Sequence, residues 1–94
     1  MDPREFSRVY NQNRAQISDC YSRASVGGDV QGIMVLRVRV SIEGRVASTR
    51  VISNSTHSRA LERCVQSAVR GWTYSRPDGG DVEVDYPMRF GPGQ

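Results

Sequence analysis

The sequence predicts an α+β fold in which two helices cover one face of a three-stranded antiparallel sheet, in the order α-β-β-α-β. Two observations predict it. Apolar residues recur at helical spacing in two segments, and they alternate with polar residues along the strand-like segments. The smallest architecture that buries all of these apolar stripes places both helices against the same face of the sheet.

Length and composition indicate a single globular domain spanning residues 1–94. The chain has 13 basic residues, all of them Arg, against 10 acidic residues, for a formal charge of +3. A chain of this size supports one hydrophobic core, which excludes most enzymes built as two lobes around a cleft. At 37% hydrophobic residues it is too apolar for a disordered tail, and its longest uncharged apolar run, residues 32–36, is too short to span a bilayer.

The first predicted element is a helix over residues 3–25. Asp2 is a typical N-cap residue, and Glu5 is placed to return a capping bond. Apolar residues then recur at three- and four-residue steps, in a stripe that is interrupted only at Asn13. The glycines at positions 27–28 end the helix.

Two strands are predicted next, over residues 30–41 and 45–53. The apolar face of the first consists of Val30, Met34, Leu36, Val38 and Val40. A short hairpin joins the strands, with Gly44 in the left-handed conformation that other residues resist. The apolar residues of the second strand do not alternate strictly, which predicts a β-bulge between Ala47 and Arg50.

A second helix is predicted over residues 57–70, with several candidate N-cap residues before it and Gly71 after it. The last strand, residues 81–90, has a perfectly alternating apolar set: Val82, Val84, Tyr86, Met88 and Phe90. Pro87 cannot donate to a hydrogen-bond ladder, so this strand belongs at an edge of the sheet. Residues 91–94 are predicted to form a flexible tail.

The sequence offers little chemistry to an enzyme. Its one histidine, His57, lies in a polar stretch without a nearby acid or nucleophile, which is typical of a surface residue. The cysteines lack the spacing of metal ligands, and no glycine-rich phosphate loop precedes a helix. We therefore predict no catalytic residue, no metal site and no cofactor.

Cys20 and Cys64 lie on the apolar stripes of the two predicted helices. Helices that pack side by side can bring two such positions within disulfide range, so we favour a bridge over two free buried thiols. A bridge would imply an oxidising compartment.

The closest basic pair in a strand is Arg37 and Arg39, and Glu83 and Asp85 have the same spacing on the outer face of the last strand. We expect these charges to pair across the sheet, which would partly neutralise the arginines. The alternative is an arginine-mediated nucleic-acid-binding face.

The polypeptide backbone is the remaining candidate for function. An open sheet edge can accept an extended peptide as an added strand, and the strand with Val82, Val84, Tyr86, Met88 and Phe90 is the candidate edge. Two alternatives stay open. In the first, Pro87 and the charges protect the edge, and it has no binding role. In the second, the edge pairs with a second copy in a homodimer.

A set of short motifs occurs in order along residues 17–90. They are Cys20-Tyr21, Gly32, Gly44-Arg45-Val46, Ser55-Thr56, Cys64-Val65, Trp72 and Tyr86-Pro87-Met88-Arg89-Phe90. As a set, they resemble the TonB-like C-terminal domain of myxobacterial gliding-motility proteins, the AgmX/PglI family.

The resemblance implies a non-enzymatic periplasmic domain of an inner-membrane-anchored protein whose membrane segment lies outside this sequence. Such domains contact outer-membrane or periplasmic proteins by strand addition and transmit force derived from the proton gradient, here in gliding motility. Energy transduction to outer-membrane transporters is the alternative within the same resemblance, and neither implies a nucleic-acid partner. The resemblance also implies an oxidised bridge between Cys20 and Cys64.

Overall fold

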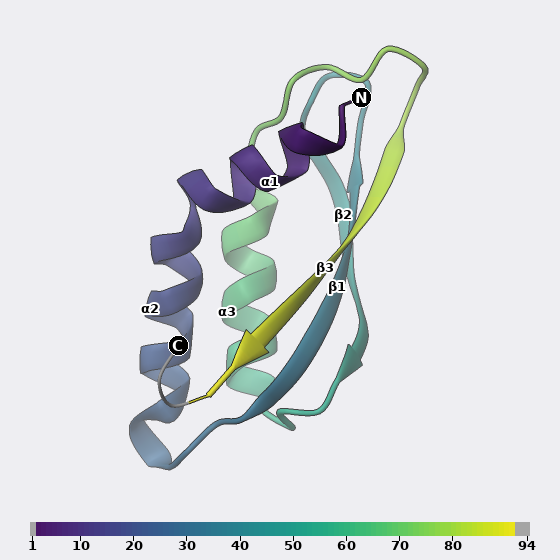
Figure 1. The fold of residues 1–94 in the computed structure, drawn as a ribbon. Coiled ribbons are helices and arrows are strands. Elements are labelled where there is room, and N and C mark those ends of the chain that lie inside the picture. The colour runs from purple at the N-terminus through teal and green to yellow at the C-terminus, as the bar shows by residue number, and fades with distance from the viewer. Residues whose placement is uncertain (1, 92–94) are drawn as a thin grey trace.

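The computed structural model describes residues 2–91, in which three α-helices lie against a three-stranded antiparallel sheet (Figure 1). The elements are α1 (Pro3–Gln12), α2 (Arg14–Ala24), a 3₁₀ turn (Ser25–Gly27), β1 (Gly32–Val40), β2 (Val46–Asn54), α3 (Arg59–Arg70) and β3 (Val82–Phe90). The predicted α+β class and antiparallel sheet are confirmed. The strands and α3 begin and end within one or two residues of the predicted positions. Of the predicted tail, Gly91 is described and buried, and residues 92–94 lie outside the described part.

The prediction of one helix over residues 3–25 was wrong, because the helix is broken at Asn13 into α1 and α2. The Asn13 side-chain Nδ2 donates to the Val9 carbonyl oxygen at 2.8 Å, and the Asn13 backbone N–H contacts the same oxygen at 3.2 Å. An asparagine side chain that takes a backbone acceptor competes with the helical hydrogen-bond ladder. The chain therefore bends here, and α1 leaves at an angle to α2 (Figure 1).

The sheet has the order β2-β1-β3, so β3 is an edge strand. The register between β1 and β3 is regular from end to end, with Gly32 opposite Phe90 and Val40 opposite Val82. This regularity keeps the backbone groups of β3 in two clean rows, one toward β1 and one away from it.

The other edge, β2, is irregular. Ala47 and Ile52 are extra residues in β2, each at a shift in its register with β1. The expected interval thus contains one bulge, at its Ala47 end, and a second bulge lies beyond it. The hairpin before β2 has Gly44 at φ 81°, as predicted, and the Gly44 carbonyl accepts a hydrogen bond from the Tyr74 N–H at 2.8 Å.

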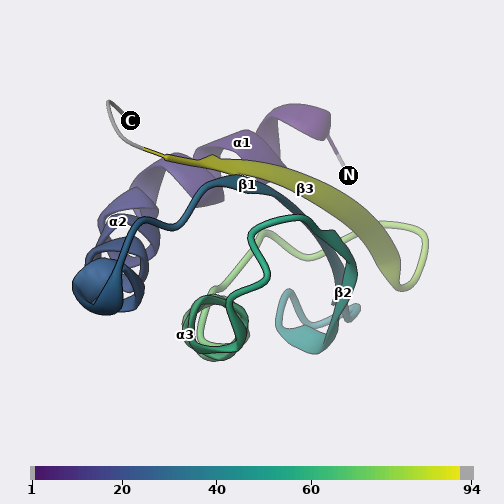
Figure 2. The same ribbon diagram turned by 90° about the horizontal axis from the view of Figure 1, so that it is seen from below.

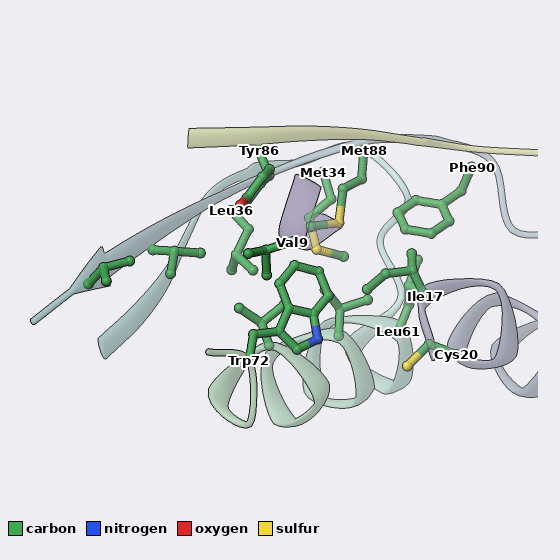
Figure 3. Close-up of a cluster of buried hydrophobic side chains, with 14 of the residues drawn as sticks. Val9, Ile17, Cys20, Met34, Leu36, Leu61, Trp72, Tyr86, Met88 and Phe90 are labelled. Carbon is green, nitrogen blue, oxygen red and sulfur yellow. The ribbon is translucent and has the colours of Figure 1, made fainter. Parts of the chain in front are cut away.

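The hydrophobic core lies between the concave face of the sheet and the helices. In Figure 2 the sheet curves over α3, with α2 beside it. Tyr86, Met88 and Phe90 point from β3 into this core, toward Trp72, Leu61 and Ile17 (Figure 3). The core residues are Val9, Ile17, Cys20, Val30, Met34, Leu36, Val38, Val40, Leu61, Val65, Val69, Trp72, Tyr74, Tyr86, Met88 and Phe90.

A disulfide between Cys20 and Cys64 joins α2 to α3. The bridge closes a loop with a sequence separation of 44 residues, and Cys20 is only 2% exposed. It fixes the relative position of α2 and α3, two of the three helices that lie against the sheet. None of the helices in the described part of the chain has the length and hydrophobicity of a membrane span.

Candidate functional site

The direction of the backbone groups along β3 follows from a contact at the far side of β1. The Ile33 N–H donates to Ser55 Oγ at 2.9 Å, and the Ile33 carbonyl accepts from the Ser55 N–H at 3.0 Å, so both backbone groups of Ile33 point toward the β2 side. Backbone N–H and C=O groups alternate in direction along a strand, so those of the even-numbered residues of β1 point toward β3. The register pairs even-numbered residues of β1 with even-numbered residues of β3, so the backbone groups of these β3 residues point toward β1.

The outward row of β3 therefore consists of Glu83, Asp85, Pro87 and Arg89. Pro87 lies where its missing N–H removes no hydrogen bond from the sheet, which is the position that an edge proline requires. The predicted edge residues Val82, Val84, Tyr86, Met88 and Phe90 belong to the correct strand, but their backbone groups face β1 and their side chains face the core. A partner strand would instead meet the backbone groups of the outward row.

A groove of about 500 Å³ runs beside this edge, between α2 and the C-terminal half of β3. Ile17, Ser18 and Tyr21 of α2 line one wall, and residues 87–91 line the other. A smaller hollow of about 200 Å³ lies between α1 and β3 and shares Tyr10 and Pro87 with the groove. The edge and the two hollows together form one elongated surface.

Aromatic side chains hold the helices beside β3 and so fix the groove. Tyr21 stacks on Phe90 with ring centroids 5.9 Å apart, and Tyr10 lies 5.5 Å from Tyr86 in the same measure. The Tyr86 hydroxyl donates to the Phe6 carbonyl at 3.0 Å. Burial raises the pKa of Tyr86 well above its usual value, so this hydroxyl keeps its proton.

The Tyr86 hydroxyl lies 3.0 Å from the Tyr74 hydroxyl and, since it donates to Phe6, it accepts there. A second tether joins the loop before β3 to α1. The Glu5 carboxylate accepts from the Ser75 N–H at 2.6 Å and pairs with Arg8 at 2.7 Å. The Glu5 side chain thus binds the loop before β3. The sequence had predicted that it would return a capping bond to Asp2. The pKa of Glu5 is lowered to about 2, first by the Arg8 hydrogen bond and then by Ser75.

The outer, helix-free face of the sheet contains the expected charge pairs in part. Arg37 makes a two-point contact with Asp85, at 2.9 and 3.1 Å, which lowers the pKa of Asp85 and raises that of Arg37. Arg39 lies opposite Glu83 but pairs with Asp81 at 3.2 Å, because a long side chain reaches the diagonal position. Both arginines of the nucleic-acid alternative are therefore paired with carboxylates.

His57, the residue considered for catalysis, is not part of the groove's lining. His57 is exposed in the turn before α3, at φ 56°, where it precedes the N-cap Ser58. Across residues 2–91, no group of three or more His, Cys, Asp or Glu side chains is placed to hold a metal ion.

The groove is the part of the site that sequence reasoning missed. Ile17 and Tyr21 belong to the apolar stripe of the first predicted helix, but a stripe alone does not show which of its members stay half-buried, as Tyr21 does. The groove itself depends on how α2 crosses β3, which no local pattern encodes.

The fold and edge described above define a domain of the TonB type. Residues 20–92 match the family described as Gram-negative bacterial TonB protein C-terminal, and the chain belongs to this family. This family is broader than the gliding-motility subfamily that the sequence resembles, and the narrower assignment stays a prediction.

Among solved structures, the chain is similar to the TonB C-terminal domain of Helicobacter pylori, determined by solution NMR. The TM-score is 0.54 and the identity 16%, with 89% of this chain and 84% of that chain covered, so the likeness shows the fold alone. No curated protein sequence matches the chain significantly.

Proposed function

We propose that this domain is a non-enzymatic periplasmic interaction module of an inner-membrane-anchored protein, and that it binds an extended segment of an outer-membrane or periplasmic partner. TonB C-terminal domains are periplasmic interaction domains, and the chain belongs to their family. The observation that carries the proposal is the outward backbone row of Glu83, Asp85, Pro87 and Arg89 on a regular edge strand.

This row offers a partner strand three N–H donors, at Glu83, Asp85 and Arg89, and four C=O acceptors, which include that of Pro87. Each hydrogen bond contributes a net ~0.5–1.5 kcal/mol, and association with ordering of the segment offsets much of the sum. The expected complex is therefore weak and reversible, as suits a connection that is made and released repeatedly.

The same geometry favours β3 over β2 as the docking edge. An added strand needs a continuous row of backbone groups, and the two bulges of β2 interrupt its row while β3 keeps a regular register. The Gln66 side chain on α3 also donates to Thr49 of β2 at 3.1 Å, which places a helix close to that edge.

We further propose that the domain transmits force derived from the proton gradient across the envelope. A pull on an added strand would pass through the β3–β1 ladder to a sheet whose covering helices are joined by a disulfide. Gliding motility is the process that the sequence resemblance implies, and energy supply to outer-membrane transporters is the alternative. Deleting the domain should abolish gliding and leave growth on iron-limited medium unchanged. The reverse result would assign it to transport.

Strand addition can be tested by amide-shift titration with peptides synthesised from periplasmic segments of the organism's outer-membrane proteins. We expect the largest shifts at the amides of Glu83, Asp85 and Arg89. Asp85→Pro should weaken binding about two- to tenfold because it removes one outward donor, whereas Asp85→Asn should bind normally, although both variants lose the ion pair with Arg37. Shifts confined to α3, or equal binding by both variants, would contradict the proposal.

A further inference from the structure

We propose that the groove between α2 and β3 selects the partner, and that it fits an acidic extended segment with one large apolar side chain. This inference rests on the proposed strand addition and goes beyond it, because an edge of backbone groups alone does not distinguish one sequence from another. The selectivity would come from the side chains of Ile17, Tyr21 and Phe90 and from the charge of Arg14.

The side chains of an added strand would alternate between the two faces of the sheet. Residues directly opposite Asp85 and Pro87 would point to the helix-free face, as those two side chains do. The residues between them would point to the helical face, where Met88 and Phe90 point into the core (Figure 3). One residue of the added strand would therefore enter the groove between α2 and β3.

Apolar side chains form part of the groove. Ile17 is 5% exposed, Met88 2% and Phe90 6%, and all three contribute to the groove as well as to the core. The half-buried Tyr21 lies over Phe90 and extends the apolar wall. A volume of about 500 Å³ leaves room for one large side chain beside the backbone of a bound segment.

The charge around the groove is positive. Arg14 contributes a cationic side chain to its lining, and none of the described lining residues is acidic. Arg89 belongs to the row of Asp85 and Pro87, whose side chains point to the helix-free face. Arg14 donates to the Asn11 side chain at 2.9 Å, and within residues 2–91 it forms no ion pair. The arginines Arg37 and Arg39 on the outer face, in contrast, are matched by Asp85 and Asp81. A carboxylate on the partner is the group that would complete the groove.

Three peptides with the same strand propensity test the inference by amide-shift titration at low ionic strength. The first is Thr-Glu-Thr-Leu-Thr-Glu-Thr with both termini capped, the second replaces Leu by Ala, and the third replaces both Glu by Lys. We expect binding of the first at the β3 edge. Loss of the apolar contact should weaken the second about tenfold, and charge reversal should weaken the third about tenfold, with a difference that salt removes.

Two matched pairs of variants locate the effect. Ser18→Phe would fill the groove, whereas Ala15→Phe places the same side chain on an exposed position of α2 outside its lining. Arg14→Glu should reverse the preference between the acidic and basic peptides, and Arg63→Glu, at an exposed position of α3, should leave it unchanged. We expect Ser18→Phe to weaken the first peptide about tenfold and Ala15→Phe to have no effect.

The outcomes separate this inference from the proposed function. If all three peptides shift the outward amides of β3 equally and Ser18→Phe changes nothing, strand addition stands and selection by the groove is overturned. If none of the peptides shifts Glu83, Asp85 or Arg89, both proposals fail at this edge. Preference for the acidic Leu peptide that Ser18→Phe and Arg14→Glu each remove supports the groove as the selecting site.

Discussion

Reduction of the disulfide between Cys20 and Cys64 should remove a large share of the stability of this domain. For a loop of 44 residues, the loop-closure relation gives about 4 kcal/mol at 25 °C. A 94-residue domain has an unfolding free energy of roughly 5–14 kcal/mol, at about 0.05–0.15 kcal/mol per residue. The bridge therefore contributes between a third and most of the total.

Trp72 provides the assay. It is the one tryptophan of the sequence and is 3% exposed, with its indole Nε1 donating to Gln16 of α2 at 2.9 Å. Its fluorescence reports whether α2 remains docked. Guanidinium unfolding of the oxidised and reduced protein should give free energies that differ by about 4 kcal/mol, with the native fluorescence of both forms alike before the transition.

The control is the double variant Cys20→Ala, Cys64→Ala, whose unfolding should not respond to the reductant. A difference below about 1 kcal/mol between oxidised and reduced protein would refute the reasoning, since the unfolded chain would then gain little freedom from the open loop.

Three further changes test the contacts that hold the site. Glu5→Gln should flatten the dependence of unfolding free energy on pH between about 4.5 and 2. The Glu5 pKa is lowered from 4.5 to about 2, so the ionised carboxylate stabilises the fold above pH 4.5, and this stabilisation is lost as the pH falls through the folded pKa. Acid titration of both proteins, followed by circular dichroism, measures it, and identical curves would contradict the role of Glu5 at Ser75. Gly44→Ala should destabilise the domain by about 1–3 kcal/mol in chemical denaturation, because φ is 81° and a Cβ would collide with the Tyr74 carbonyl; an unchanged midpoint would show that the hairpin adjusts. Tyr86→Phe should cost about 1–3 kcal/mol by leaving the carbonyl of α1 and the Tyr74 hydroxyl without their partner, and a loss near zero would mean that water replaces it.

The strands could be predicted because their physical signal is local. In β1 and β3, alternation of apolar and polar residues follows from the two-residue period of a strand with one buried face. Pro87 then identified β3 as an edge strand, because a proline in the middle of a sheet would remove a ladder hydrogen bond. These two patterns together fix the edge that we propose as the binding site.

The features that escaped prediction depend on contacts between distant residues or on competition within the backbone. Asn13 interrupts an apolar stripe, but a side-chain bond to Val9 was needed to turn that interruption into a helix break. Arg39 could reach Glu83 or Asp81, and only the observed geometry selects Asp81. The groove joins α2 to β3 across most of the sequence, so it follows from packing and from no motif.

Hydrogen exchange of the β3 amides, measured with and without a bound partner segment, tests strand addition most directly. In the free domain, the amides of Val84, Tyr86 and Met88 should be protected by β1, while those of Glu83, Asp85 and Arg89 exchange rapidly. Binding should protect the second set and leave the first unchanged. Binding that slows exchange in β2 or α3 and leaves Glu83, Asp85 and Arg89 fast would contradict addition of a strand to β3.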